Sequence, residues 1–417
     1  MPDVQPRLVV FTTLFPHPGQ PNAGLFIRER MFRVGKLIPL VVVAPVPWFP
    51  FQNLLRRWRP HFRPDAPAKE VQDGFEVLHP RFFSVPGQFK FLDGLFMAVG
   101  SLATLLKLKR SFNFNIIDAH FAYPDGYAAT LLGKWLRVPV TITLRGTEVP
   151  LSETTLRRRL MLNALDRATR IFAVAGSLKR LAVGMGVEED KIATVGNGVD
   201  TQKFYPLPKD AAREQLDIPP HAKILVSVGG LVERKGFHRV IECLPELRQC
   251  FPDIIYLIVG GPSAEGDCSA ELRSQVKALG LVDSVRFLGS MPPERLRLPL
   301  CAADVFVLAT RNEGWANVFL EAMACGRPVV TTDVGGNAEV VCLPHLGTLV
   351  PYGDKQALTK AAADALSHEW DTDMIINYAR SNAWDLRVTL LEREFARVIS
   401  GAFHDGEVVN PLSPEAE

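Results

Sequence analysis

Glu313–Val330 reads EGWANVFLEAMACGRPVV, and this stretch decides the fold. It follows a short β-branched run at Val305–Leu308 and opens a segment with helical spacing at Val318–Cys325. A strand that turns directly into a helix presents free backbone N–H groups and the positive end of the helix dipole to an anion. The stretch therefore predicts an anion-binding turn at the edge of a parallel α/β sheet.

Two carboxylates flank this predicted turn. Glu313 lies in the loop, and Glu321 lies about one and a half turns inside the helix. A phosphate between them would find amide donors at Asn317 and Val318, which leaves the carboxylates to accept hydroxyl groups of a ribose or a sugar. An acidic residue near a helix start is also favoured by the dipole alone. The preceding strand, Gly314 and the following helix together favour the binding site.

A second segment with phosphate-binding character is Val228–Gly236, which reads VGGLVERKG. Its glycines, Gly230 among them, let the backbone approach phosphate oxygens. Arg234 offers a planar fork of donors and Lys235 a point charge. A solvated loop with two surface cations would have the same letters, so this segment alone does not distinguish the two interpretations.

Short strand-like runs alternate with helix-length amphipathic segments along the whole chain, which predicts a parallel α/β architecture. The predicted strands of the first half are Leu8–Thr13, Leu40–Val43, Ile116–Ala119, Val140–Leu144, Ile171–Val174 and Lys191–Val195. Those of the second half are Ala222–Val228, Ile254–Val259, Val285–Leu288, Val305–Leu308, Pro328–Thr332 and Thr348–Val350.

A domain boundary is expected where the first series ends. The turn signal Gly196-Asn-Gly198 is followed by Pro206 and Pro208. We expect an N-terminal Rossmann-like domain over residues 1–200 and a second one over 201–383. Two such halves facing each other would place a ligand in the cleft between them. Residues 402–417 are polar and contain two prolines, which predicts a loose tail.

Charge is distributed unevenly between the halves. Residues 1–205 hold 27 Lys and Arg against 16 Asp and Glu, a net charge of +11, whereas the remainder holds 20 against 29, a net charge of −9. A basic half predicts an anionic partner, either a membrane surface or a phosphorylated ligand. No nucleic-acid-binding motif with interleaved aromatic residues is present, so nucleic acid is not expected as a partner.

Two features bear on membranes. The longest apolar run, Gly94–Leu106, is shorter than the roughly 20 residues that cross a bilayer, and Met1–Arg7 does not read as a secretory leader. Pro47–Phe51 and Leu54–Arg59 mix aromatic residues with cations, as interfacial segments do. We therefore expect a cytoplasmic protein, docked peripherally on an anionic inner leaflet. A loop packed on its own domain is the alternative.

No metal site is expected. The six cysteines contain no C-x-x-C pair and no neighbouring histidine cluster. A literal Asp-x-Asp occurs at Asp371–Asp373, but it stands at a polar helix start far from the predicted phosphate segments, so we interpret it as a surface feature.

The two phosphate segments, at this separation, resemble the retaining glycosyltransferases of family 4, which have the GT-B fold. Glu313 and Glu321 match the family's E-x7-E signature, and Val228–Gly236 resembles its G-x-x-x-x-K-G diphosphate-binding stretch. The resemblance extends over roughly residues 7–400, including Asp118-Ala-His120 and Thr143–Glu148. The opening run from Phe15 to Arg28 is similar to members that build exopolysaccharide or cell-wall polymers.

The resemblance implies a role for each matching residue. Arg234 and Lys235 would neutralise the donor diphosphate as it leaves. Glu313 would hold sugar hydroxyls, and Glu321 would bind the ribose. His120 would lie near the anomeric carbon on the acceptor side. The remaining donor-binding positions would be Gly24, Gly230, Leu288, Asn317 and Val318. The helix over residues 384–401 would cross back onto the first domain.

The implied reaction moves a sugar from a UDP- or GDP-sugar to a glycan or lipid-linked acceptor with retention, without a metal or other cofactor. An anionic leaving group mainly requires preorganised positive charge. The alternatives are a non-catalytic nucleotide-sugar-binding scaffold and a GT-B nucleotide-sugar epimerase. The chain departs from the family at Asn22-Ala-Gly24, where many members have Gly-Gly, and at Arg145, where many have histidine.

Overall fold

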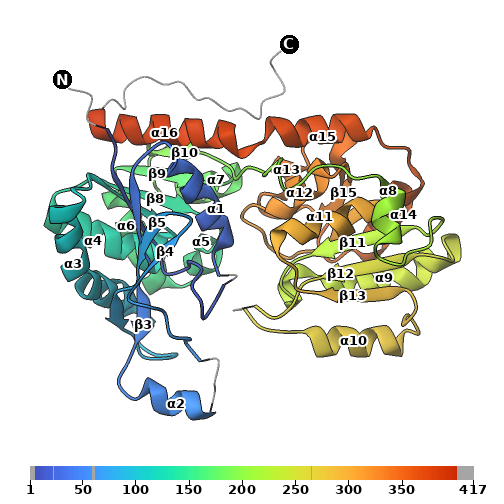
Figure 1. Cartoon of the computed structure of the whole chain (residues 1–417), viewed down its shortest axis with the longest axis horizontal. Helices are drawn as coiled ribbons and strands as arrows, with labels where there is room; N and C mark the ends of the chain where they lie inside the picture. The colour runs from blue at the N-terminus through green and yellow to red at the C-terminus, as the bar shows by residue number, and fades with distance from the viewer. Residues whose placement is uncertain (1–4, 22, 59–61, 264, 402–417) are drawn as a thin grey trace. The chain divides into compact units, whose positions relative to one another are not determined.

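The computed structural model describes residues 5–21, 23–58, 62–263 and 265–401, and it divides the chain into two compact units (Figure 1). Unit 1 is formed by the chain up to Gly196 together with the chain from Arg387 onward, and unit 2 runs from Asn197 to Leu386. The first boundary lies four residues before the predicted one, because Val199 already pairs with Ala383 of unit 2. The predicted tail, 402–417, lies outside the described residues.

Unit 1 contains an eight-stranded sheet in the order β10-β9-β8-β7-β1-β2-β5-β4. All neighbouring pairs are parallel except β4 with β5, an antiparallel edge pair that the sequence interpretation did not include. A separate parallel pair, β3 with β6, was also missed; β3 contains a proline, which argues against a strand in the sequence. The strands are β1 (Leu8–Phe11), β2 (Leu40–Val43), β3 (Val46–Trp48), β4 (Lys69–Gln72), β5 (Phe75–Leu78), β6 (Arg81–Phe83), β7 (Ile116–His120), β8 (Val140–Leu144), β9 (Arg170–Ala173) and β10 (Ile192–Thr194).

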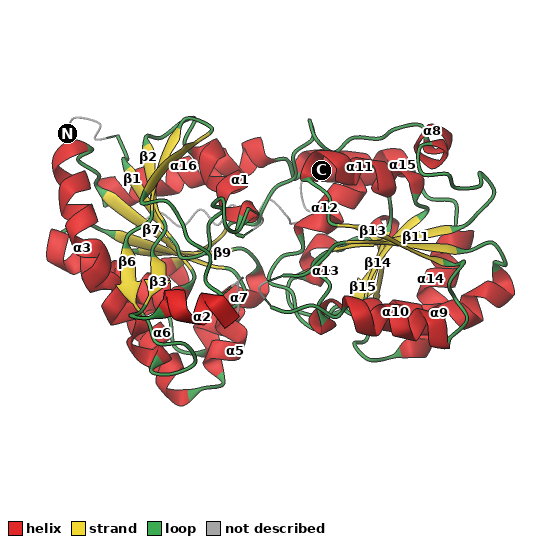
Figure 2. Ribbon diagram, turned by 60° about the horizontal axis from the view of Figure 1, so that its bottom comes forward, coloured by secondary structure: helices red, strands yellow, loops and turns green. Residues whose placement is uncertain are grey.

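Helices cover both faces of this sheet (Figure 2). Its α-helices are α1 (Leu25–Val34), α2 (Gln52–Trp58), α3 (Asp93–Ser111), α4 (Tyr127–Leu136), α5 (Glu148–Ser152), α6 (Thr155–Arg167) and α7 (Gly176–Gly184); the shorter turns are η1 (Lys90–Leu92), η2 (Ala122–Gly126) and η3 (Glu189–Lys191). The last helix, α16 (Trp384–Ser400), begins in unit 2 and contributes Val388, Leu391, Phe395 and Val398 to the unit 1 core.

One helix of unit 1 corrects the expectation about membrane-spanning length. Gly100, Ser101 and Thr104 do not interrupt α3, so the helical segment Lys90–Ser111 is long and apolar enough to cross a bilayer by length and composition. However, α3 packs against α4 and β6, and Met97, Ala98 and Leu105 are completely buried. One face of this apolar helix is therefore part of the domain core.

Unit 2 contains a six-stranded, fully parallel sheet in the order β13-β12-β11-β14-β15-β16. Its strands are β11 (Ile224–Val228), β12 (Ile255–Val259), β13 (Val285–Gly289), β14 (Val305–Leu308), β15 (Val329–Thr332) and β16 (Gly347–Val350). Its helices and turns are α8 (Lys209–Glu214), η4 (Glu233–Lys235), α9 (Phe237–Cys250), α10 (Ser269–Ala278), α11 (Pro293–Ala302), α12 (Asn317–Ala324), α13 (Asn337–Val340), η5 (Pro344–Leu346), α14 (Lys355–Ser367) and α15 (Thr372–Ser381).

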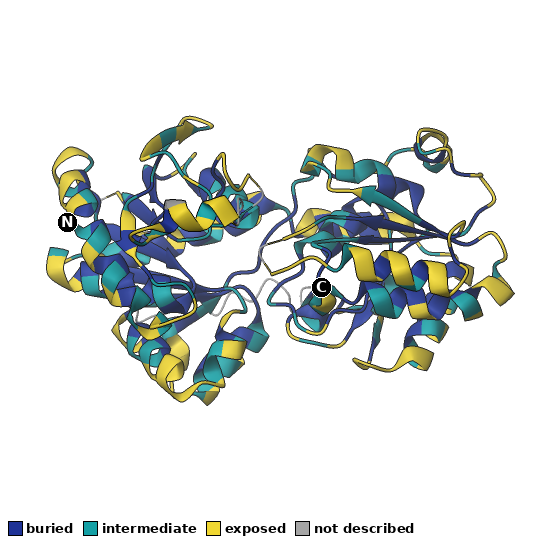
Figure 3. Ribbon diagram, turned by 90° about the horizontal axis from the view of Figure 1, so that it is seen from below, coloured by how far each residue is buried: buried dark blue, intermediate teal, exposed yellow. Residues whose placement is uncertain are grey.

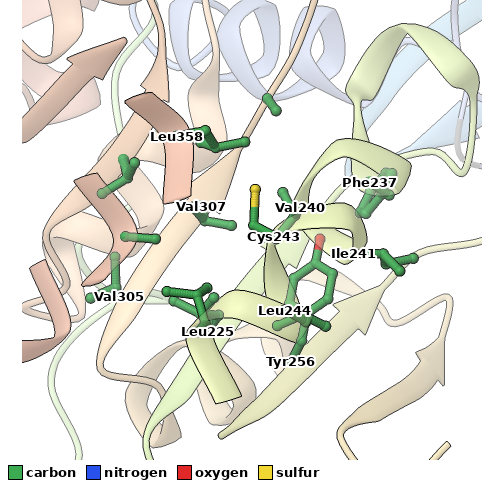
Figure 4. Close-up of a cluster of buried hydrophobic side chains, with 14 of the residues drawn as sticks. Leu225, Phe237, Val240, Ile241, Cys243, Leu244, Tyr256, Val305, Val307 and Leu358 are labelled. Atoms are coloured by element: carbon green, nitrogen blue, oxygen red, sulfur yellow. The ribbon is translucent and has the colours of Figure 1, made fainter. Parts of the chain in front are cut away.

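Most of the central strands are buried, and the helices expose residues on their outer faces (Figure 3). In unit 2 the core lies between the sheet and the helices α9 and α14. Leu225 of β11, Val307 of β14 and Tyr256 of β12 meet Phe237 of α9 and Leu358 of α14 there (Figure 4). These aromatic and aliphatic side chains are buried, and their packing holds the strands in position. The loops at the ends of these strands carry the candidate site.

Candidate active site

Both sheets have a point where the strand order reverses, and ligands in open α/β sheets bind there. In unit 2 this point lies between β11 and β14, which pair through Leu225 with Val305 and Val226 with Phe306. The two phosphate segments recognised in the sequence follow these two strands. Unit 1 has the equivalent point between β1 and β7.

The loops after β11 and β14 bring three of the predicted residues together. Lys235 Nζ donates to Glu313 Oε1 at 2.6 Å, and Arg234 Nη1 donates to the same oxygen at 3.2 Å. Thr310 Oγ1, just after β14, donates to it at 3.1 Å. Glu313 is buried, whereas the two cations keep part of their surface exposed. The result is a concentrated positive charge held in place by one carboxylate.

A further carboxylate in this cluster was not anticipated from the sequence. Glu265, in the loop after β12, accepts two hydrogen bonds from Arg234, at 2.8 Å from Nε and 2.7 Å from Nη2. This pairing raises the pKa of Arg234 and lowers the pKa of Glu265. A bidentate guanidinium–carboxylate pair is geometrically specific, so Glu265 fixes the plane of the Arg234 guanidinium.

Gly236 sets the geometry of the cationic turn. Its φ of 73° is in the left-handed region, and a Cβ at this position would lie 2.0 Å from the carbonyl oxygen of Ala309. Glycine is required on both counts. The Gly236 backbone thus packs closely on Ala309, just after β14. The loops after β11 and β14 are also joined by a hydrogen bond, because Arg311 N–H donates to the carbonyl of Arg234 at 2.8 Å.

The start of α12 lies next to this cluster in the chain. The residue before it, Ala316, provides no side-chain cap, and the first turn contains no acidic residue, so the N-terminal N–H groups and the dipole are suited to an anion. Asn317 accepts a hydrogen bond from Asn197 at 2.9 Å. Val318 and Glu321, in the first and second turns, are half-buried.

The other predicted donor-binding residues of unit 2 lie at neighbouring strand ends. Gly230 follows β11, and an added Cβ would touch Ser263 at 3.0 Å. Leu288, near the end of β13, is half-buried. Leu231 N–H donates to the Gly261 carbonyl at 2.9 Å, so the loops after β11 and β12 lie backbone to backbone.

In unit 1, His120 ends β7 in a completely buried position. Arg145, which follows β8, donates from Nε and Nη2 to His120 Nδ1, both at 3.1 Å. Because a guanidinium only donates, Nδ1 is unprotonated and the proton is on Nε2, 3.4 Å from Asp118 Oδ2. Burial lowers the pKa of His120 and raises the pKa of Asp118 to about 6. The imidazole is therefore neutral.

This burial affects the role expected for His120. The imidazole has no exposed surface, and its Nδ1 faces the Arg145 guanidinium, which is half-buried and lies 5.1 Å from the centre of the Phe26 ring.

The turns around His120 are fixed by two buried carboxylates. Glu148 accepts hydrogen bonds from the backbone N–H groups of Gly146 at 2.7 Å, Arg145 at 3.1 Å and Ala122 at 3.2 Å. Glu148 therefore holds the backbone of the turn that carries Arg145. Asp125 accepts from Thr13 N–H and, at 3.2 Å, from Thr13 Oγ1. Burial raises the pKa of Asp125 to about 7.

Gly24 is the unit 1 counterpart of Gly236. It has a φ of 67°, precedes α1, and would place a Cβ 2.1 Å from the Leu14 carbonyl oxygen. Arg28, on the following turn, pairs with Asp73 at 2.5 Å, and Glu29 pairs with Arg33. Arg28 and Glu29 have different partners because residues one apart on a helix do not face each other.

Comparisons with known proteins bear on this arrangement. The profile described as Glycosyl transferases group 1 matches residues 208–382, and that described as Glycosyltransferase Family 4 matches residues 60–203. A D-inositol 3-phosphate glycosyltransferase of Corynebacterium urealyticum is 32% identical over 290 residues, covering 65% of this chain and 68% of that protein. The chain belongs to glycosyltransferase family 4. It is therefore a glycosyltransferase.

Two further similarities extend over more of this glycosyltransferase. TuaC of Bacillus subtilis, assigned as a teichuronic acid biosynthesis glycosyltransferase, is 26% identical over 360 residues, covering 85% of this chain and 88% of that protein. The structure of Anabaena HepE in complex with UDP matches with a TM-score of 0.70 at 21% identity, over 95% of this chain and all of that one. Sucrose-phosphate synthase from Thermosynechococcus elongatus matches with a TM-score of 0.73 at 19% identity, again over 95% of this chain and all of that one. The fold is GT-B.

Three structural residues of the two sites were missed in the sequence. Glu265 lies in the loop after β12, and its only signal in the sequence is an acidic residue shortly after Gly260-Gly-Pro262. Asp125 stands five residues after His120, and Thr13 ends the first strand region. Their partners are far away in sequence, 112 residues for Thr13 and Asp125, so no local spacing reveals them.

Proposed function

We propose that this glycosyltransferase moves a sugar, with retention, from a nucleotide-diphosphate sugar to a glycan or lipid-linked acceptor in bacterial surface polysaccharide synthesis. One observation carries the donor part of the proposal. Arg234 and Lys235 converge on Glu313 Oε1 beside the uncapped start of α12. A nucleoside diphosphate needs both the cations and the amide donors.

The chemistry that follows rests on charge placement. Breaking the bond between the sugar and the phosphate leaves an anion, and fixed positive charge stabilises that anion as it forms. Arg234 and Lys235 would contact the diphosphate, with backbone N–H groups at Asn317 and Val318 on its oxygens and Gly230 close to it. Glu313 would accept sugar hydroxyls, Glu321 would accept ribose hydroxyls, and Leu288 would lie beside the base.

The sites in unit 1 support a role on the acceptor side. His120 and Arg145 form a preorganised pair at the sheet edge, and Gly24 begins the helix after β1. We propose that Arg145, oriented by His120, lies near the reacting sugar. We assign no protein nucleophile, since the leaving phosphate can accept the proton of the acceptor hydroxyl. No metal or other cofactor is part of the proposed reaction.

The names of similar proteins support a choice of substrates to test. TuaC is assigned to a cell-envelope polymer, and HepE was solved with UDP. A relative from Mycolicibacterium smegmatis, 34% identical over 228 residues, is named a GDP-mannose-dependent mannosyltransferase of a phosphatidylinositol mannoside. We therefore propose a UDP- or GDP-sugar donor, and an enzyme that works on the cytoplasmic side of the membrane, peripherally bound to the inner leaflet.

The first test is a thermal-shift panel with UDP, GDP, ADP and their sugars. A ligand at a hundred times its dissociation constant should stabilise the protein by about 2.7 kcal/mol. Stabilisation by one nucleotide family, lost in Lys235→Ala and Glu321→Ala but retained in the exposed control Lys360→Ala, is the expected result. No shift with any nucleotide would contradict the donor site.

A second measurement separates the alternatives. Product analysis by NMR, with and without an acceptor, should show a transferred sugar of unchanged anomeric configuration only when acceptor is present. A changed sugar nucleotide without acceptor would indicate an epimerase, and nucleotide binding without any turnover would indicate a scaffold.

A further inference from the structure

The outward face of α3 is an apolar stripe on the surface of unit 1. Leu95, Val99 and Leu106 are 41%, 59% and 44% exposed, and Ala103 between them is also exposed. Their spacing of four, four and three residues places them on one side of the helix. The opposite side carries the residues buried against the domain, so the stripe is not part of the core.

A second exposed group adjoins the start of this helix. Lys90, just before α3, donates to Ser84 Oγ at 2.9 Å, and Arg63, shortly after α2, donates to the Ser84 carbonyl at 2.7 Å. These bonds tie the region of α2 to the start of α3. Both segments carry exposed aromatic side chains, which are Trp48, Phe51, Trp58, Phe83, Phe89 and Phe91.

The exposure of these aromatic residues is unusually high. Phe51 and Trp58 are 81% and 83% exposed. Single exposed apolar residues are ordinary, but a contiguous group marks an interaction site. Tryptophan and phenylalanine on an amphipathic segment, with cations beside them, are typical of proteins that lie in the interface of a bilayer.

The charges around the stripe favour an anionic occupant. No Asp or Glu occurs between Asp93 and Asp118 in the sequence. Lys107 and Arg110 are exposed at the far end of α3, and Arg81 is exposed on β6, which packs against the helix. An apolar stripe with exposed cations at its far end and on the neighbouring strand matches a surface of acyl chains under negatively charged headgroups.

We infer that the outward face of α3, together with the exposed aromatic residues of Trp48–Trp58 and Phe83–Phe91, is the surface by which this protein docks onto an anionic bilayer. This inference deepens the proposed function, on which it rests for the lipid-linked acceptor. It adds the apolar outward face of α3 to the aromatic and basic segment Pro47–Arg59 that the sequence indicated.

The test is flotation of the full-length protein with vesicles of phosphatidylcholine alone or with 30% phosphatidylglycerol. The wild type should float with the anionic vesicles and lose binding at high salt. The triple variant Leu95→Gln/Val99→Gln/Leu106→Gln should bind at least tenfold more weakly. The matched control in unit 2, Leu279→Gln/Val282→Gln, removes two exposed apolar residues and should bind as the wild type does.

A second variant tests the charges without altering the apolar residues of the stripe. Lys107→Gln/Arg110→Gln should weaken binding to anionic vesicles by about fivefold per cation at low salt. Both variants should keep the nucleotide thermal shift, which separates loss of docking from loss of the donor site or of folding.

Two results would overturn the inference. The first is a wild type that ignores anionic vesicles or a triple variant that binds them normally. The second is a wild-type dimer, seen by light scattering, that the triple variant converts to a monomer, because the stripe would then be covered by a second copy of the chain.

Discussion

The two strand-order reversal points of this glycosyltransferase share their topology but differ in how they hold charge. Each unit places a left-handed glycine before the helix that follows its first central strand, Gly24 in unit 1 and Gly236 in unit 2. In unit 1 the ionisable groups His120, Asp118 and Asp125 are buried. In unit 2 Arg234 and Lys235 remain partly exposed beside Glu313 and Glu265. The same backbone therefore supports a sealed polar network in one unit and an accessible cationic site in the other.

The largest expected effect concerns the accessible site. Lys235→Ala should lower kcat/KM by about 10²–10³-fold, because one preorganised donor to the leaving group is lost. The melting temperature should change little, since Arg234 and Thr310 still bond to Glu313. Steady-state kinetics and calorimetry on the same preparation measure both. An unchanged kcat/KM would mean that Lys235 does not stabilise the leaving group.

The two helix-start glycines test whether the shared backbone matters equally. Gly24→Ala and Gly236→Ala should each lower the free energy of unfolding by roughly 3 kcal/mol or more, since the new Cβ meets a carbonyl oxygen at a positive φ. The matched controls are Gly74→Ala and Gly353→Ala. Both have a φ of 85° and no atom within 4 Å of an added Cβ, so they should cost about 1 kcal/mol. Equal losses in all four variants of a denaturation series would contradict this account.

Glu148→Gln probes the sealed network. The amide keeps the size of the side chain, but its NH2 group cannot accept the backbone N–H bonds of Gly146 and Arg145. Loss of stability by about 2 kcal/mol is expected from bonds to a buried charge. Urea denaturation provides the number, and an unchanged nucleotide thermal shift would locate the damage in unit 1. An unchanged free energy of unfolding would mean that the hydrogen bonds accepted by Glu148 do not stabilise unit 1.

The pH dependence of stability should also differ between the units. The pKa of Asp125 is raised from 3.8 to about 7, so the native state holds a proton that the unfolded state has released between those values. Stability therefore falls as the pH rises through that window, by about 1.4 kcal/mol per pH unit at most. Asp125→Asn should flatten the profile measured between pH 5 and 8. The exposed control Glu153→Gln should leave it as it is.

The smallest effect is expected at Glu265. This residue is more than half exposed and competes with a diphosphate for Arg234. Glu265→Ala should tighten nucleotide binding by two- to fivefold, in keeping with the modest value of exposed ion pairs. Isothermal titration against the isosteric control Glu265→Gln would show whether the charge is responsible. Weaker binding in the alanine variant would mean that Glu265 mainly orients the guanidinium.

The sequence predicted twelve of the strands and the unit 2 cluster because both depend on local patterns. Strand hydrophobicity alternating with helical spacing placed β11 and β14, and the phosphate segments follow them directly. The edge pair β4 and β5 escaped, because short, half-exposed strands carry little hydrophobic signal.

The contacts that the sequence did not predict are between residues far apart in the chain. Three hydrogen-bonded pairs form only when the ends of different strands come together in the fold. They are Arg234 with Glu265, Arg145 with His120, and Thr13 with Asp125. A neutral, packed His120 was one of two interpretations of the sequence, since a histidine at a strand end reads the same whether it is buried or exposed; the structure shows it to be buried.

The path of α16 has a consequence for how the protein is made. The core of unit 1 is incomplete without Phe395, which packs on Phe172 at 5.5 Å, and Glu394 pairs with Arg170 at 2.8 Å. A ribosome delivers these residues only after the whole of unit 2 has been synthesised. The half of the chain that is synthesised first is therefore the half that finishes folding last, and its exposed apolar surface must wait for the final helix.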